Sequence, residues 1–201
     1  MLSPVVNEMY RVAFHEAGHA AACARRRRFV QRRFGGDILS CSAFYNRVLR
    51  DVTASPGRDA NGPYHGKTDI RSRRYYNKNQ LMAHIEYYVG SLVSEVTFFE
   101  SFYARGAYCD LTLAHLAAEF IVCFLEDDGM QAVEFKTEKR CELPRRRLPE
   151  IESRIGQYVA DAEERLFVAY ENKDFKDIVE EFALNVYNAK DKILKEPEIY
   201  K

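Results

Sequence analysis

Two histidines and a glutamate in the stretch "RVAFHEAGHA" (residues 11–20) have the residue types and the spacing of a metal site. His15 and His19 are four residues apart, so a helix places both imidazoles on one face. Glu16 directly follows the first histidine and can face a water molecule on the same ion. Zinc peptidases use this HExxH pattern with the glutamate as general base. We therefore predict that His15 and His19 bind Zn2+ and that Glu16 activates water.

The alternative interpretation is that HExxH occurs here by chance in an ordinary helix. Two observations favour the metal site. The neighbouring residues are small and apolar, as in "AAA" at 20–22, which is typical of a buried helix. Burying two histidines and a glutamate without partners costs several kcal/mol, and a bound metal removes that cost.

A catalytic zinc site needs a third protein ligand and an open position for water. Residue types alone leave this third ligand undecided among cysteine, histidine and carboxylate side chains. The best local context is "ARGAYCDLTLAHLAAEFIVCFLEDDGM" (104–130), where a Gly-Ala turn leads into Asp110 at the start of an apolar helix. A plain helix N-cap is the alternative role for Asp110. The candidates are Cys23, His65, His84, Glu86, Glu95, Cys109, Asp110, His115 and Glu119.

The hydrophobic pattern predicts a mainly α protein with one small β element. Ser3 and Pro4 are a typical helix start, and Gly129 is a typical residue just after a helix end. Residues 53–68 are rich in Gly, Pro, Asp and Asn, which predicts a long polar loop. We expect helices over about 4–28, 78–99, 110–128, 151–172 and 176–192, and one or two strands within 38–49.

Four motifs, in this order, resemble the peptidase domain of the FtsH-type AAA membrane zinc metalloproteases. That family carries HEAGHA, a Gly-Gly-Arg-x-Ala-Glu-Glu helix, a Gly-Ala-x-x-Asp-Leu turn, and a long helix ending in Gly-Met. The counterparts here are "HEAGHA" (15–20), "GSLVSEV" (90–96), "GAYCDL" (106–111) and "GM" (129–130). The final "KILKEPEI" also looks like the end of the family's peptidase domain. The resemblance covers most of residues 8–195.

The resemblance implies one FtsH-peptidase-like domain over residues 1–201. Its zinc-binding core would span 1–149, with a small β element near the active site, and a C-terminal helical hairpin would span 150–201. It implies His15, His19 and Asp110 as zinc ligands and Glu16 as catalytic base. Glu95 matches a glutamate of the family's middle helix, and we expect it either to orient a histidine or to lie at the core edge. The implied activity is that of a zinc metalloendopeptidase.

The chain also departs from the family pattern. The middle motif lacks its second Gly, its Arg and its second Glu, and Cys109 stands where Asn is usual. The segment after the histidines is enlarged and rich in arginine. In the family, a β element here pairs with extended substrate, so "ILSCSAFYNRVL" (38–49) is expected to provide an edge for strand addition.

The composition indicates the compartment in which the protein is expected to work. Five cysteines without paired spacing fit a reducing compartment, and we find no signal peptide and no run of about 18 apolar residues. We therefore expect a cytoplasmic protein without a membrane span. The resemblance implies a homo-oligomer that acts on polypeptide. Because the family's ATPase module has no counterpart in these residues, we expect either small or unfolded substrates or a separate AAA ATPase partner.

Arginines are concentrated in "RRRRFVQRR" (25–33), "RSRR" (71–74) and "RRR" (145–147). Such runs more often form a solvated or interaction surface than a nucleic-acid site, and no DNA-binding motif accompanies them, so we do not expect nucleic-acid binding. The arginine-rich runs suggest an alternative function for the chain. In it, the chain is a non-catalytic binding or regulatory protein on the same scaffold. Its Arg-rich surface would contact an acidic partner or nucleic acid, and any zinc would be structural.

Overall fold

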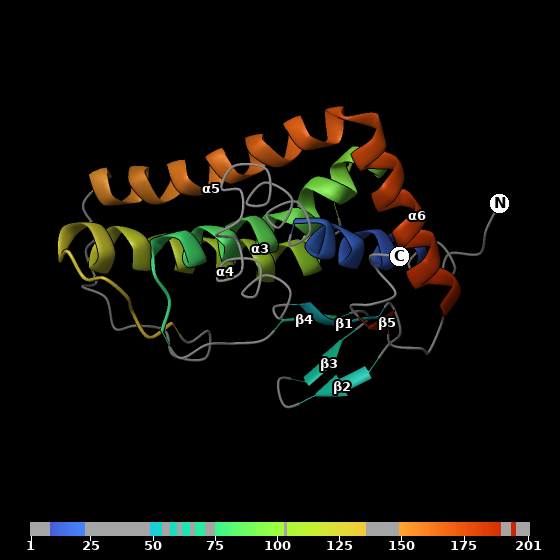
Figure 1. The fold of residues 1–201 in the computed structure, drawn as a ribbon, viewed down its shortest axis with the longest axis horizontal. Helices are drawn as coiled ribbons and strands as arrows, with labels where there is room; N and C mark the ends of the chain where they lie inside the picture. Colours follow the sequence, from blue (N-terminus) through green and yellow to red (C-terminus); the bar gives the residue numbers. More distant parts are fainter. Residues whose placement is uncertain are drawn as a thin grey trace, which may run out of the picture.

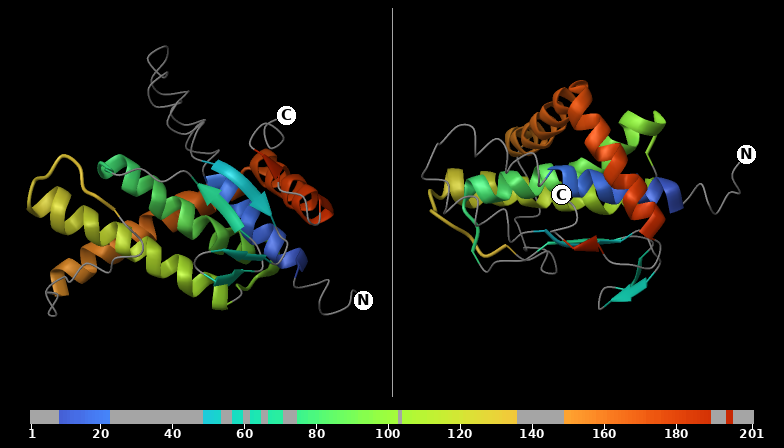
Figure 2. Two further views of the ribbon diagram at one scale, coloured as in Figure 1. Left: turned by 90° about the horizontal axis from the view of Figure 1, so that it is seen from below. Right: turned by 45° about the vertical axis from the view of Figure 1, so that its right-hand side comes forward.

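The computed structural model describes residues 9–22, 49–53, 57–59, 62–64, 67–70, 75–102, 104–135, 149–189 and 194–195. Over these residues the protein is mainly helical, as the sequence predicts. Helices form one layered body, and short strands lie on the side of it opposite α5 (Pro149–Glu171). Figure 2 shows the same layering from two further directions. The three arginine clusters, the ends of the first predicted helix and residues 38–48 of the predicted β element lie outside the described residues.

The first helix is described over residues 9–22, and it crosses the long helix α3 (Lys78–Phe99) at two glycines. A Cβ atom added to Gly18 would lie 2.3 Å from the carbonyl oxygen of Gly90, and one added to Gly90 would lie 2.6 Å from that of Gly18. The two backbones are therefore in direct contact. Only glycine at both positions allows this crossing, because any side chain would have to displace a helix backbone.

The bounds of α3 agree with the sequence prediction. Asn77 caps its start: the Asn77 side chain accepts a hydrogen bond from the Gln80 amide, and the Gln80 side chain accepts one from the Asn77 amide, both at 3.0 Å. This capping box satisfies two amides that a helix start otherwise leaves unpaired. At the other end, Glu100 adopts a left-handed conformation with φ 55° and stops the helix.

The third helix begins earlier than predicted. α4 (Ala104–Phe120) continues into a π-helical segment, η1 (Ile121–Asp127), and Gly129 with φ +66° follows its end, as expected. The Gly-Ala step before Asp110 is thus a helical turn, so the prediction of a non-helical turn there is wrong. Asp110 lies inside the helix and is not an N-cap. By length and composition alone, Gly106–Asp127 is apolar enough to cross a membrane, as is also common for core helices.

α5 packs against both α3 and α4 through a buried stripe. The stripe has helical spacing, and its apolar side chains join the main hydrophobic core. α5 is followed after one residue by α6 (Lys173–Ala189), and the Asn172 side chain accepts a hydrogen bond from the Phe175 amide at 3.0 Å. Figure 1 shows the two helices meeting at a corner, whereas the predicted hairpin requires antiparallel packing. The stripe consists of Ile155, Val159, Ala162, Leu166 and Tyr170.

The described strands are short and form two antiparallel groups. One has the order β4-β1-β5, and the other pairs β2 with β3. β1 pairs with β4 from Leu49↔Ile70 to Thr53↔Lys67, and with β5 through Asp51↔Lys195 and Val52↔Leu194. The predicted long loop over 53–68 is therefore wrong for the residues that pair. The bounds are β1 (Leu49–Thr53), β2 (Gly57–Asp59), β3 (Gly62–Tyr64), β4 (Lys67–Ile70) and β5 (Leu194–Lys195).

Candidate metal centre

The structure brings His15, His19 and Asp110 together, although two helices far apart in sequence supply them. Within the described part of the chain, this is the one group of three such side chains able to share an ion, with ligand atoms within 4.8 Å of one another. Asp110 Oδ2 lies 3.1 Å from His15 Nε2 and 3.4 Å from His19 Nε2. Ligand atoms at about 2.0–2.1 Å from a tetrahedral zinc are about 3.3 Å apart. The donor types and their separations therefore fit a zinc ion.

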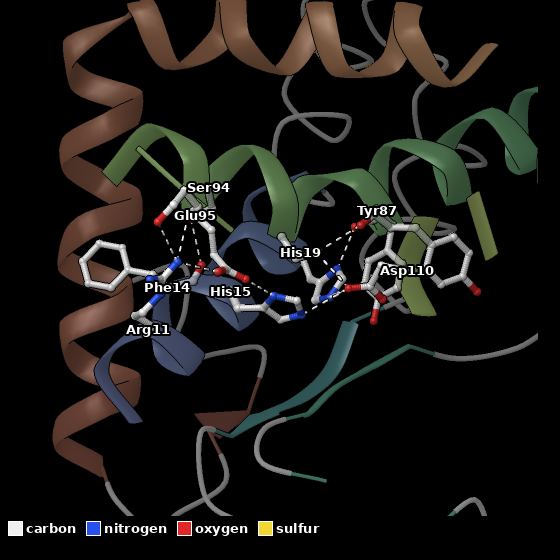
Figure 3. A network of polar contacts seen from close by, with 11 residues as sticks. Arg11, Phe14, His15, His19, Tyr87, Ser94, Glu95 and Asp110 are labelled. Atoms are coloured by element: carbon white, nitrogen blue, oxygen red, sulfur yellow. Dashed lines mark hydrogen bonds and ion pairs between the residues drawn. The ribbon is translucent and has the colours of Figure 1, made fainter. Parts of the chain in front are cut away.

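Both imidazoles are held from behind by α3, as Figure 3 shows. His15 Nδ1 lies 2.7 Å from Glu95 Oε1, and His19 Nδ1 lies 2.7 Å from the carbonyl oxygen of Tyr87. A carbonyl oxygen only accepts, so His19 carries its proton on Nδ1 and leaves the Nε2 lone pair free. The carboxylate of Glu95 favours the same tautomer in His15. Outer partners of this kind are what fixes the orientation of metal-binding histidines.

Close packing around the histidines depends on a third glycine. A Cβ added to Gly106 on α4 would lie 3.2 Å from His15 Cε1, which is tighter than most contacts of this type. The first turn of α4 therefore runs directly over the imidazole. With the crossing of Gly18 and Gly90, this means that three of the four motifs quoted for the family resemblance contribute a glycine that makes room for the site.

The electrostatics of the site favour a cation. Burial alone lowers the pKa of the His15 imidazole, but hydrogen bonds to Asp110 and Glu95 and the charge of Glu16 outweigh it and raise the pKa to about 10. Burial raises the pKa of Asp110, whereas His19 and His15 lower it far below its usual value. Three carboxylates thus surround one imidazole, and one of them, Glu95, is also paired with the guanidinium of Arg11. A divalent ion balances such an excess of buried negative charge.

Access to the centre is narrow. The side chains of His15 and Asp110 are 14% and 15% exposed, so the ligand atoms lie just beneath the surface. Glu16 is buried, at 5% exposure, and lies near enough to His15 to affect its pKa. Among the described residues the group offers three protein ligands, the number typical of catalytic zinc sites, whereas structural zinc sites have four.

Sequence reasoning missed three of the contacts around the ligands. Arg11 donates to Glu95 Oε2 at 3.3 Å and to the carbonyl oxygen of Ser101 at 2.9 Å, so it holds Glu95 from the outer side. Ser91 Oγ donates to Asp110 Oδ2 at 2.9 Å. The carbonyl of Tyr87 leaves no signal in a sequence. The spacing of Arg11 from His15, and of Ser91 from Glu95, is one helical turn in each case and is the signal that could have found them.

The other candidate ligands lie elsewhere. His84 packs among the aromatic rings of Tyr76, Tyr88 and Phe135, where burial lowers its pKa to about 4. Glu86 accepts a hydrogen bond from Arg165 at 2.9 Å. The remaining described candidates are outside the ligand group: Cys109 and His115 are exposed and Glu119 is buried, whereas Cys23 and His65 lie outside the described residues.

No protein-family model matches this chain, and no curated protein matches it either. Two histidines and one carboxylate are a donor set that can hold zinc once the imidazoles are neutral, and a neighbouring glutamate is a residue type that serves as base in metal-assisted hydrolysis.

Proposed function

We propose that the protein is a zinc-dependent metalloendopeptidase with His15, His19 and Asp110 as ligands and Glu16 as base. One observation carries the proposal: both Nε2 atoms lie 3.1–3.4 Å from Asp110 Oδ2, while both Nδ1 atoms are engaged by α3. The three ligand atoms are thereby directed at one point. The resemblance of the four motifs to FtsH-type peptidases supports the same assignment.

Zinc, when bound, polarises a carbonyl group and lowers the pKa of its water to about 7. Glu16 accepts the proton of the attacking water and then donates it to the departing amine. Glu95 and the Tyr87 carbonyl keep both imidazoles in the tautomer that leaves Nε2 available.

The substrate in this proposal is an extended polypeptide. The β element over 38–49 would pair with it by strand addition, and β1 begins at the last residue of that element. Substrates would be small or already unfolded, or a separate AAA ATPase would deliver them. By the same resemblance, we propose that the domain works as a homo-oligomer in the cytoplasm.

The test compares wild type with Glu16→Gln for bound zinc and for cleavage of a panel of unfolded proteins. Glu119→Gln is the matched control, because that carboxylate is equally buried, at 3% exposure, and lies outside the ligand group. We expect Glu16→Gln to keep zinc and to lose about 10²–10⁴-fold in cleavage rate, the usual contribution of a general base. The control should keep both, and a chelator should abolish wild-type cleavage.

The outcomes separate the two function classes. Wild type that binds zinc but cleaves no member of the panel contradicts the enzyme and favours the non-catalytic protein with structural zinc. Cleavage by Glu16→Gln at the wild-type rate contradicts only the role of Glu16 as base and leaves the metallopeptidase proposal standing. Unchanged zinc affinity in Asp110→Ala contradicts the ligand assignment.

A further inference from the structure

We propose that Ser91 is a positioning residue for the third metal ligand, Asp110. This inference rests on the metal site of the proposed function. It concerns a position where the family pattern has glycine, so the resemblance implies no role for it. If it is correct, α3 supports every ligand of the centre while contributing none itself.

Three positions on α3 follow each other at intervals of one turn and contact three different ligands. Tyr87 accepts from His19 through its carbonyl, Ser91 donates to Asp110, and Glu95 contacts His15. Residues separated by four lie on one face of a helix, so a single face of α3 lies along the whole centre. The backbone contact of Gly18 with Gly90 fixes how closely this face approaches.

Ser91 is 0% exposed, and its hydroxyl has two acceptors in reach. Asp110 Oδ2 is 2.9 Å away, and the carbonyl oxygen of Tyr88 is 3.1 Å away. A hydroxyl has one proton to donate, and a bond to an ionised carboxylate is about twice as strong as one between neutral groups. The proton therefore goes to Asp110.

The acceptor oxygen is the same atom that faces both imidazoles. Asp110 Oδ2 has two lone-pair directions, so it can accept from Ser91 on one side and face the ion on the other. Without Ser91, the described contacts of the Asp110 carboxylate are those with the two histidines, and its side chain is 15% exposed. The hydroxyl thus fixes a carboxylate that is otherwise free to turn toward solvent.

The experiment measures zinc affinity by competition with a chromogenic chelator and the visible absorption bands of bound Co2+, which report ligand geometry. The variant is Ser91→Ala. Ser94→Ala is the matched control, because Ser94 lies on the same helix, is also 0% exposed, and donates at 2.8 Å to the carbonyl oxygen of Phe14, which is not a ligand. Ser91→Gly removes the same hydroxyl with no steric demand and is the second variant if Ser91→Ala does not fold.

We expect Ser91→Ala and Ser91→Gly to bind zinc about 10- to 100-fold more weakly and to change the Co2+ bands. Ser94→Ala should match wild type in both. Wild-type affinity and spectrum in the Ser91 variants overturn the inference, and so does an equal loss in Ser94→Ala, because the effect is then one of packing. Wild type that binds neither metal overturns the proposed function itself, so the two failures are distinguishable.

Discussion

Gly18→Ala is the sharpest test of how the helices position the metal centre. The new methyl group would lie 2.3 Å from the Gly90 carbonyl oxygen and 2.6 Å from Ser94 Cβ. An ordinary van der Waals contact begins at 3.4 Å, so the first helix and α3 must separate by about 1.1 Å (3.4 − 2.3) at the crossing. Neither neighbour is the end of a flexible side chain, so the strain falls on two helix backbones.

The expected cost follows from this displacement. Overpacking a core costs about 1–3 kcal/mol, and contact between two backbones puts Gly18→Ala at the upper end. Alanine gains about 1 kcal/mol over glycine in a helix, so the net loss in the free energy of unfolding is about 2 kcal/mol. The same displacement lengthens the 2.7 Å contacts of His15 with Glu95 and of His19 with Tyr87 to about 3.8 Å, which is no longer a hydrogen bond.

Urea unfolding of the metal-free protein and zinc titration measure both effects. Zinc binding should weaken about 10- to 100-fold, since both histidines lose their outer partners. Gly156→Ala on α5 is the control, because a Cβ there meets nothing within 4 Å, and it should stabilise by up to about 1 kcal/mol. If Gly18→Ala unfolds at the wild-type urea concentration and binds zinc as tightly, the glycine crossing does not position the site.

Two further predictions concern Arg11, beside the candidate ligands, and His84, in the aromatic core away from them. Arg11→Gln removes the guanidinium that donates to Glu95, a side chain that is 1% exposed. The loss of this charged hydrogen bond should cost about 1.5–3 kcal/mol in urea unfolding and weaken zinc binding, and wild-type values for both would contradict the pairing. Burial lowers the pKa of His84 from 6.5 to about 4, so on acidification the unfolded chain binds a proton before the folded chain does. The contribution of His84 to the free energy of unfolding is therefore fully present above pH 6.5, and about 3 kcal/mol is lost as the pH falls to 4. The measurement is the free energy of unfolding between pH 6.5 and 4. In His84→Phe this pH-dependent loss of about 3 kcal/mol should disappear, whereas a variant with Gln in place of the exposed His115 should still show it.

The long helices were predictable because local signals and periodicity agree. For α3, Asn77 and the turn of residues after it set the start, and the apolar pattern runs to Phe99. The start of α4 was not predictable in the same way. Gly106 indicates a turn by its intrinsic preference, yet it lies in a helix, where a side chain would press against the His15 ring. Tertiary packing against His15 explains this glycine, and sequence rules for helix ends and turns do not take such packing into account.

The grouping of the candidate ligands was predictable, whereas the residues that contact them were less so. His15, His19 and Glu16 follow from spacing, whereas Asp110 required the family resemblance, since many carboxylates and cysteines were available. Arg11 and Ser91 act through other side chains and have no motif of their own. Strands of three or four residues in a segment rich in glycine and proline were also missed, because so few residues cannot establish an alternating pattern.

Under the proposed function, the face of α3 that carries Tyr87, Ser91 and Glu95 separates the control of metal retention from the chemistry. Substitutions along this face can change how firmly zinc is held while the ligands and the base stay intact. Two chains with an identical HEAGH signature can therefore differ widely in the zinc concentration at which they become loaded. Over evolutionary time, such a protein can adapt its metal requirement gradually, without passing through a form that lacks a ligand.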